Sequence, residues 1–277
     1  MLFFVTENAE PQSKLGKKQG TSTVVSYRTG DEKKPWKNLS SLSATLPSRY
    51  IFDVHLGSTV VPFRLLKPWR AVLPINDQRI LTDEQIDNAD DGLRSWWSQA
   101  TDLWEKNKTK QSKLSLMERL DYQNTLSKQL NAVKHRVVYS KSGNTLAAAR
   151  ISTPHTIIDH KLYWMPANGI SEARFLSAIL NAPVTTKMVS IYQSRGLFGT
   201  RDFDKNVWRL PIPKYSPKNA LHQEIVALAE EAELIASQVD TKDYKFKKVR
   251  AIVRNELSLA NVSVKLDAAV KALLNGA

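Results

Sequence analysis

The chain has 277 residues, and its 40 Lys and Arg against 27 Asp and Glu give a formal net charge of +13 and a pI near 9.8. So large a positive excess favours a polyanionic partner, because binding releases counterions and attraction raises the encounter rate, which makes nucleic acid the leading candidate. The sequence contains no cysteine, which excludes disulfides and thiolate chemistry and leaves a zinc site only His and carboxylate ligands.

The sequence carries no signal for a membrane. No apolar run approaches the roughly 18 residues that a span requires. The opening letters MLFFVTENAEP lack the basic segment that begins a signal peptide, and no helical pattern pairs a strongly basic face with a clean apolar one. We therefore expect a soluble, cytoplasmic protein without a membrane partner.

Residues 1–80 are predicted to be rich in β-structure. Branched and aromatic residues occur in short runs bounded by Gly or Pro, as in half-buried strands. Residues 7–20, which include three lysines, and the charged residues 29–37 are predicted to be loops. The predicted strands are 1–5, 21–27, 50–54, 60–66 and 72–75.

Residues 81–132 are predicted to form a helical insertion, because the apolar period changes there from two to 3.6. Thr82 and Gln85 have the spacing of a capping box, and the acidic residues that follow favour a solvated helix surface over a DNA-binding face. A second helix is predicted over residues 114–130. The expected inward positions of the two helices are Ile86, Leu93, Trp96, Trp97, Ala100, Leu103 and Trp104, then Leu116, Leu120, Leu126 and Leu130.

Residues 133–215 are predicted to form a mixed α/β unit. The turn Lys141-Ser142-Gly143-Asn144 between two apolar runs is typical of a hairpin. Ser171 is expected to cap a helix that ends at Asn181, and Pro183 ends that helix and permits another over residues 184–192. The predicted strands of this unit are 136–139, 147–151 and 156–165.

Residues 216–277 are predicted to form a helical tail. Ser216 and Pro217 suit the N-cap and first position of a helix that runs to about Val239. Two shorter helices are expected between residues 245 and 274, with a break near Asn261. The apolar stripe of the first helix is Ile225, Leu228, Ala232 and Ile235.

A basic loop, QSRGLFGTRDFDKNVWRLPIPKY, occupies residues 193–215. Gly196 and Gly199 predict a tight turn, and Pro211 and Pro213 predict an extended exit. Guanidinium groups held on such a loop suit contacts with phosphates and base edges. An ordinary surface loop is the alternative, and these residues alone do not separate the two. The cations of the loop are Arg195, Arg201, Lys205, Arg209 and Lys214, against Asp202 and Asp204.

We searched the sequence for catalytic motifs and found none. It has no GxxxxGK[ST] phosphate loop, no glycine-rich cofactor turn and no GxSxG elbow. Asn181-Ala-Pro183-Val184 lacks the second proline and the aromatic residue of an adenine methylase loop, so it is interpreted as a helix junction. His155 and His160 would point to opposite faces of a strand, which disfavours a shared metal. Asp31-Glu32-Lys33 matches only part of the Asp…Glu-x-Lys pattern of nucleases, and a solvated turn is the preferred interpretation.

Two basic regions remain as candidates for nucleic-acid binding. The hairpin turn with Lys141, Ser142 and Asn144, the strand residue Lys161, and the basic loop could together form one surface that faces a groove. The second region is a run of cations, for which phosphate contact and a solvated helix face stay open as alternatives. That run comprises Lys242, Lys245, Lys247, Lys248 and Arg250.

Several strings of the sequence, taken in order, resemble the carboxy-terminal region of large N6-adenine DNA methyltransferases found in fused type II restriction-modification enzymes. The resemblance spans residues 46–239, and LPIP before a long helix is also similar to half-units of type I restriction specificity subunits. The strings are VVPFRLLKPWRAVLPI (60–75), GLRSWW (92–97), RVVYSKSGNTLAAARI (136–151), TIIDHKLYWM (156–165), FLSAILNAP (175–183) and QSRGLFGTRDFDKNVWRLPIP (193–213).

The resemblance implies a target-recognition region that binds duplex DNA. In these families an upstream domain or separate subunit methylates adenine with S-adenosylmethionine. Because the cofactor and catalytic motifs are missing here, the resemblance supplies no catalytic residue, no cofactor-binding or metal-binding residue, and leaves open whether the chain is an enzyme.

The sequence therefore predicts an α+β protein with small mixed sheets, a helical insertion and a long C-terminal helix. Its expected function is DNA recognition for bacterial defence by restriction and modification. One alternative is a protein-interaction or specificity subunit that docks a separate methylase. The other is a nuclease whose catalytic residues are too far apart in the sequence to be recognised. The expected DNA-binding residues are Lys141, Asn144, Lys161, Gln193, Arg195, Arg201, Lys205 and Arg209.

Overall fold

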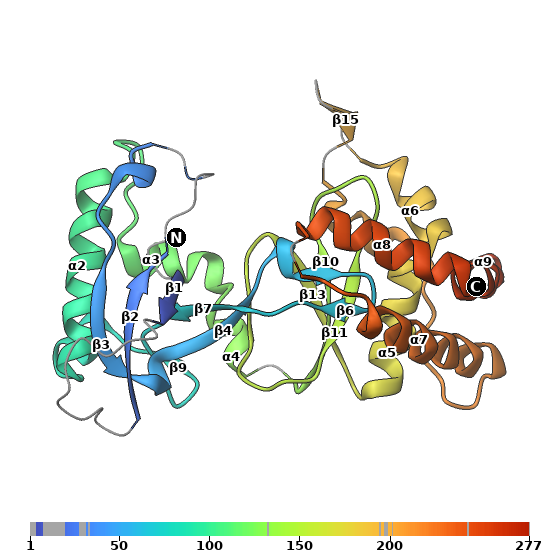
Figure 1. Cartoon of the computed structure of the whole chain (residues 1–277), viewed down its shortest axis with the longest axis horizontal. Coiled ribbons are helices and arrows are strands. Elements are labelled where there is room, and N and C mark those ends of the chain that lie inside the picture. Colours follow the sequence, from blue (N-terminus) through green and yellow to red (C-terminus); the bar gives the residue numbers. More distant parts are fainter. Residues whose placement is uncertain are drawn as a thin grey trace. The chain divides into compact units, whose positions relative to one another are not determined.

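The computed structural model of the protein describes residues 4–7, 20–27, 32, 34–131, 133–193, 195–196, 199–200, 202–242 and 244–276. It confirms the predicted α+β class, with several small sheets and with helices at the C-terminal end of the chain (Figure 1). The chain forms two compact units. The N-terminal unit comprises Met1–Val54, Trp69–Ala132 and His155–Ile157, and the C-terminal unit comprises His55–Pro68, Val133–Pro154 and Ile158–Ala277.

A six-stranded sheet with the order β12-β4-β7-β1-β2-β3 supports the N-terminal unit. Its pairs from β4 to β3 are antiparallel. The strand predicted over residues 72–75 is instead the end of β7 and the start of a separate hairpin of β8 (Ile75–Asn76) and β9 (Arg79–Ile80). The sheet strands are β1 (Phe4–Glu7), β2 (Thr21–Ser26), β3 (Ser43–Pro47), β4 (Ile51–His55), β7 (Trp69–Val72) and β12 (Ile157–Ile158); 3-10 turns lie at Trp36–Asn38 and Ser48–Tyr50.

The helical insertion begins as predicted. The Thr82 hydroxyl accepts the Gln85 N–H at 3.2 Å, and the Gln85 side-chain oxygen accepts the Thr82 N–H at 2.9 Å. The prediction of one continuous second helix over residues 114–130 is wrong. Gln123 adopts φ +56° and divides this segment into separate short helices. Asn88 ends the first helix, and Asp90 caps the next. The helices are α1 (Asp83–Asp87), α2 (Asp91–Asn107), α3 (Leu116–Leu120) and α4 (Ser127–Leu130), with a 3-10 turn at Tyr122–Asn124.

The tryptophans of α2 lie in the core of this unit, as predicted. Trp96 and Trp97 are buried with Leu46 of β3, and the Trp97 indole N–H donates to Asp83 at 3.1 Å. Gly92 allows this close approach, since a Cβ there would strike the backbone of Thr45 in β3.

A three-stranded antiparallel sheet, β11-β10-β13, forms one side of the C-terminal unit, and α5 packs on it. The predicted hairpin is confirmed. The strand predicted over residues 156–165 is divided instead, because the Asp159 carboxylate accepts the Lys161 N–H at 2.9 Å and turns the chain between β12 and β13. Gly169, and not Ser171, is the N-cap of α5. These elements are β10 (His135–Ser140), β11 (Ala148–Ile151), β13 (Leu162–Ala167), α5 (Ile170–Asn181) and α6 (Pro183–Ser190).

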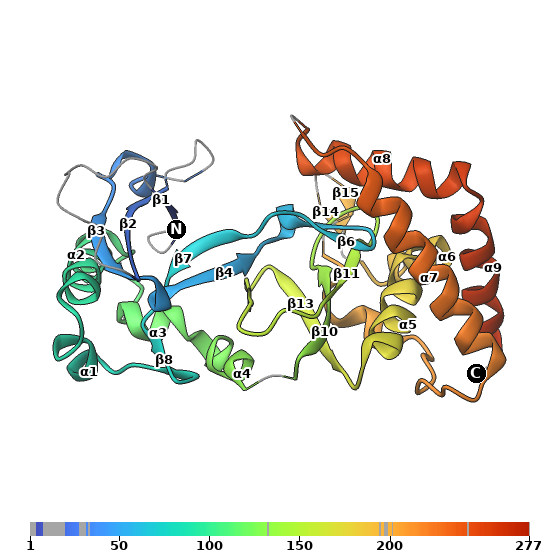
Figure 2. The same ribbon diagram turned by 60° about the horizontal axis from the view of Figure 1, so that its bottom comes forward.

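Three helices complete the C-terminal unit: α7 (Ala220–Gln238), α8 (Phe246–Leu259) and α9 (Val262–Asn275), which pack together with α5 (Figure 2). The break at Asn261 is confirmed, with φ +58° there. The predicted cap at Ser216 is wrong. Asn219 caps α7 by accepting the His222 N–H at 3.2 Å, and the Ser216 N–H donates to the His222 ring at 3.0 Å.

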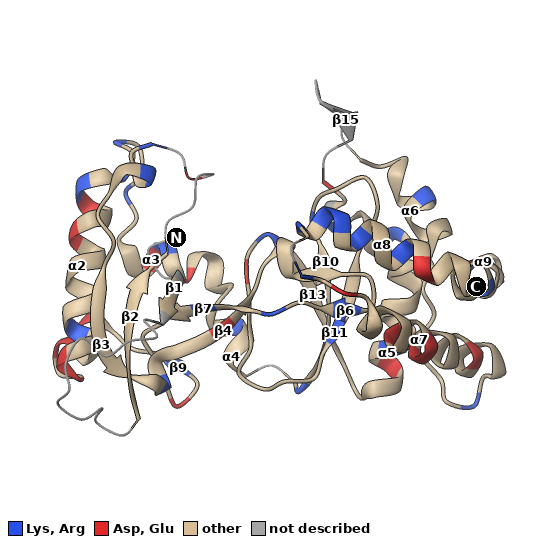
Figure 3. Ribbon diagram, in the orientation of Figure 1, with Lys and Arg blue, Asp and Glu red and all other residues tan. Residues whose placement is uncertain are grey.

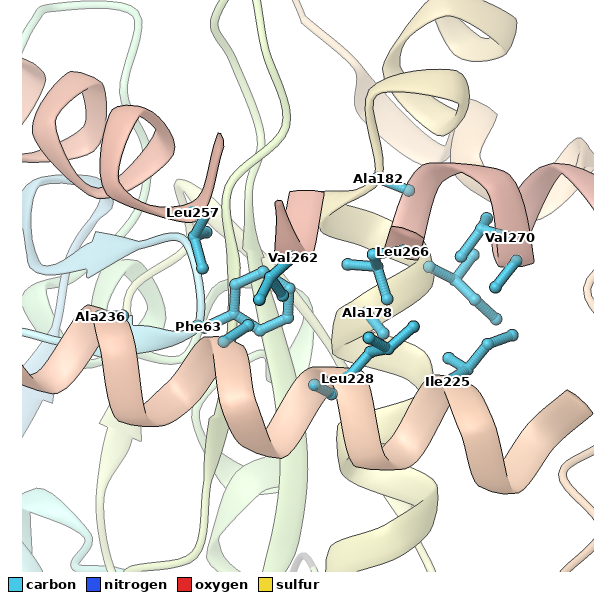
Figure 4. Packing of buried hydrophobic residues seen from close by; sticks show 14 of the residues in the cluster. Phe63, Ala178, Ala182, Ile225, Leu228, Ala236, Leu257, Val262, Leu266 and Val270 are labelled. Atoms are coloured by element: carbon cyan, nitrogen blue, oxygen red, sulfur yellow. The ribbon is translucent and has the colours of Figure 1, made fainter. Parts of the chain in front are cut away.

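Residues 55–68 contribute a hairpin to the core of the C-terminal unit, where one strand over residues 60–66 was expected. Phe63 at its turn adopts φ +59°, is 6% exposed, and packs among Leu228 and Val262 (Figure 4). Arg64 donates to the carbonyl oxygens of Ala236 and Val239, which end α7, at 2.9 and 2.7 Å. The hairpin strands are β5 (Val60–Val61) and β6 (Arg64–Leu65), after a 3-10 turn at Gly57–Thr59.

Candidate nucleic-acid interface

The turn after β10, which we call the hairpin tip (residues 141–144), joins segments that are distant in sequence. The Phe203 N–H donates to the Lys141 carbonyl at 2.8 Å, and the Lys141 N–H donates to the Lys161 carbonyl at 3.3 Å. Ser142 and Asp202 form an isolated β-bridge. These bonds bring three of the predicted regions together: the tip, the start of β13, and the basic loop.

The second half of the basic loop folds as a 3-10 turn, η5 (Asp204–Arg209). One side of this turn is apolar and buried, and the other side is exposed. Phe203 and Val207 are fully buried and anchor the turn in the core, which leaves Lys205 and Arg209 exposed. The Arg209 guanidinium lies 5.0 Å from the centroid of the Tyr192 ring, a cation–π contact that orients it.

The first half of the loop pairs β14 (Arg195–Gly196) with β15 (Gly199–Thr200), in agreement with a tight turn. Arg201 lies outside the described residues, and the structure describes only the backbone of Arg195. Asp31 and Lys33, from the partial nuclease pattern, also lie outside the described residues.

The remaining predicted residues differ in exposure. Asn144 and Lys161 are exposed, whereas Lys141 is half-buried with its ammonium 5.5 Å from the centroid of the Tyr163 ring. Gln193 is only 7% exposed, and its side-chain amide donates to the Gly143 carbonyl at 3.2 Å. Gln193 therefore supports the hairpin tip from within and does not offer its amide to solvent.

Two aromatic residues beside this surface were not predicted as functional. Tyr192 is 44% exposed, and Trp208 is 45% exposed with its ring edge-on to Tyr139 at 6.0 Å. Exposed aromatic rings among cations suit stacking on bases. The sequence signal was the tryptophan between Lys205 and Arg209, but periodicity alone could not show that its ring remains exposed.

Lys161 lies two residues after Asp159, whose carboxylate accepts hydrogen bonds from His160 and from the Lys161 N–H. Burial alone would raise the pKa of Asp159, but the hydrogen bond and charge of His160, together with Lys161, lower it overall. The carboxylate stays ionised to hold the turn, with His160 Nδ1 at 3.1 Å. In the described part of the chain, no group of three His, Cys, Asp or Glu residues is arranged to hold a metal ion.

Four cations and one amide at this end define what we call the tip surface: the half-buried Lys141 and the exposed Asn144, Lys161, Lys205 and Arg209. Figure 3 shows the distribution of charged residues over the elements. The arrangement offers hydrogen-bond donors to an anion. Among the described residues, no helix has the length and apolar character needed to cross a bilayer.

No protein-family model and no curated protein matches the chain. Among solved structures, the chain is similar to the type IIG restriction endonuclease BpuSI, with 16% sequence identity and a TM-score of 0.40. The match covers 81% of this chain and 26% of that enzyme, so the chain spans about a quarter of the enzyme's length.

Proposed function

We propose that the protein binds duplex DNA through the tip surface, as the target-recognition region of an N6-adenine methyltransferase of a restriction-modification system. The observation that carries this proposal is the meeting of the hairpin tip, Lys161 and η5, which gathers cations from three predicted basic regions at one end of the C-terminal unit. The resemblance of the sequence strings to such recognition regions supports it independently.

The members of the tip surface have different roles in this proposal. Lys161 and Lys205 are flexible point charges that neutralise phosphates, whereas Arg209, oriented by Tyr192, can read a base edge or bind a phosphate with two donors. Asn144 can offer its amide to adenine, and Trp208 offers a stacking face. Arg195 and Arg201, which belong to the same basic loop in the sequence, are proposed to add further DNA contacts.

A salt titration tests the proposal. We expect the binding constant for a 30-base-pair duplex to fall steeply with salt, with a log-log slope that decreases in magnitude by about 0.9 for each phosphate contact removed. The triple variant Lys161→Gln, Lys205→Gln and Arg209→Gln should therefore have a slope shallower by about 2 to 3, measured by fluorescence anisotropy.

A matched variant controls for net charge. Lys218→Gln, Lys265→Gln and Lys271→Gln removes three exposed cations, one from the turn before α7 and two from α9. Its slope should stay near that of the unmodified protein. Equal slopes for the two triple variants would refute the tip surface as the interface.

The proposed division of labour assigns methyl transfer to another domain or subunit, which would bind S-adenosylmethionine. Incubation of the purified chain with tritiated S-adenosylmethionine and plasmid should transfer no methyl groups. Addition of an adenine methylase partner should give transfer that depends on Arg209. Transfer by the chain alone would instead favour the enzyme alternative.

A further inference from the structure

The two arginines of α8 have structural roles. Arg250 donates to the carbonyl oxygens of Val60 at 2.9 Å and Gly57 at 2.7 Å, and Arg254 donates to the Leu146 carbonyl at 3.1 Å. Burial, and then the charge of Arg254, lower the pKa of Arg250 to about 10. The Arg250 guanidinium thus stays charged at neutral pH, and both guanidinium groups fasten the helix to its unit.

The lysines around the start of α8 have no such role. We call Lys242, Lys245, Lys247 and Lys248 the α8 lysine patch; all four are exposed, and none forms an ion pair with a described residue. Arg174 of α5, by contrast, contacts Glu230 at 2.8 Å and Glu233 at 3.0 Å.

Charge is also segregated between neighbouring helices. The sequence of α7 contains four glutamates and no Lys or Arg, whereas α8 contains one glutamate and four Lys or Arg. Figure 3 shows the contrast, with blue segments along α8 and red segments along α7. The first turn of α8 holds lysines and no acid, although the helix dipole favours acids there. The stability of the helix therefore does not explain this arrangement.

The helix that carries Lys247 and Lys248 contacts the turn that bears the hairpin tip, within one compact unit. Leu146, which accepts the Arg254 hydrogen bond, belongs to the turn between β10 and β11 that carries the hairpin tip. Lys247 precedes Arg254 by seven residues, which is about 10 Å along a helix. About three base-pair steps of duplex DNA cover a similar length, with a phosphate on each strand at each step.

We propose that the α8 lysine patch binds the phosphate backbone of the same duplex beside the recognised sequence, without reading its bases. This inference rests on the proposed function, because it needs a duplex held at the tip surface. Exposed lysines that form no ion pair with a described residue suit this role, since an ammonium group binds phosphate as a point charge and carries no geometric preference for a base.

The test is the triple variant Lys245→Gln, Lys247→Gln and Lys248→Gln, with Lys218→Gln, Lys265→Gln and Lys271→Gln as the charge-matched control. We expect the salt slope on a 30-base-pair duplex to become shallower by about 2 to 3 for the α8 variant only. The ratio of specific to non-specific affinity should not change, and replacement of the same lysines by Arg should restore the slope.

Each outcome has a distinct meaning. A flat salt slope for the unmodified protein overturns both the proposed function and this inference. A steep slope that the α8 variant shares with the control overturns this inference alone, and an altered specificity ratio overturns its sequence-independent character. Loss of binding to phosphatidylserine vesicles with DNA binding unchanged would assign the α8 lysine patch to a membrane surface and also overturn it.

Discussion

At the scale of single residues, His222 shows how a buried polar group is kept neutral. Its ring lies 4.6 Å from that of Phe175, and its Nδ1 accepts the Ser216 N–H, which requires that nitrogen to be unprotonated. Burial lowers the pKa of His222 from its ordinary value of 6.5. The unfolded chain therefore binds a proton at this position more readily than the folded protein does.

The resulting prediction concerns pH. The free energy of unfolding should be fully retained above pH 6.5 and should fall as the pH drops below it, because protonation then favours the unfolded chain. His222→Gln should reduce this dependence, measured by urea denaturation at pH 7.5 and 5.5. His155→Asn, at an exposed position with φ +60°, is the control and should keep it. An unchanged pH dependence in His222→Gln would exclude this histidine as the cause.

At the scale of elements, the junction between α5 and α6 completes the edge strand β11. The Asn181 side chain accepts the Ala148 N–H at 2.9 Å and donates to the Ala148 carbonyl at 2.8 Å. The string Asn181-Ala-Pro183-Val184, interpreted from sequence as a helix junction, is one: α5 ends at Asn181 and α6 begins at Pro183. The Asn181 amide is therefore engaged by the backbone of β11.

Asn181→Ala should therefore destabilise the protein. It removes the acceptor of the buried Ala148 N–H, which should lower the free energy of unfolding by about 1 to 3 kcal/mol. Asn255→Ala, on the exposed side of α8, should change it by less than about 0.5 kcal/mol. Denaturant melts of both variants check this, and a loss of similar size in the two would show that the Ala148 bond is unimportant.

At the scale of the whole molecule, the two units interleave along the chain. Residues 55–68 come from within the N-terminal half of the sequence, yet Phe63 fills the core of the C-terminal unit. A fragment of residues 133–277 would therefore lack part of its own core.

Two measurements test this interleaving. Phe63→Ala should lower the free energy of unfolding of the C-terminal unit by about 3 to 5 kcal/mol, whereas Phe52→Ala, a half-buried position in β4, should affect the other unit. The fragment 133–277 should melt at a lower temperature than the same fragment with residues 55–68 attached. Equal melting temperatures would contradict the assignment of this segment.

Part of the candidate interface could also be predicted from sequence. The exposure of Lys161, Lys205 and Arg209 agrees with their positions in charged turns, because a charge without a partner stays in water. Gln193 could not be placed, since whether an amide faces solvent depends on the Gly143 carbonyl fifty residues away. The exposure of the Tyr192 and Trp208 rings could not be predicted either, since it depends on tertiary packing.

The sequence by itself determined what depends on neighbours a few positions apart: the capping box at Thr82, the tryptophan stripe of α2, the break at Asn261 and the excess of positive charge. Only the tertiary structure decided that Phe63 joins the second unit and that the hairpin tip meets η5. Local patterns follow from backbone geometry and side-chain periodicity, whereas these contacts depend on which distant surfaces exclude water together.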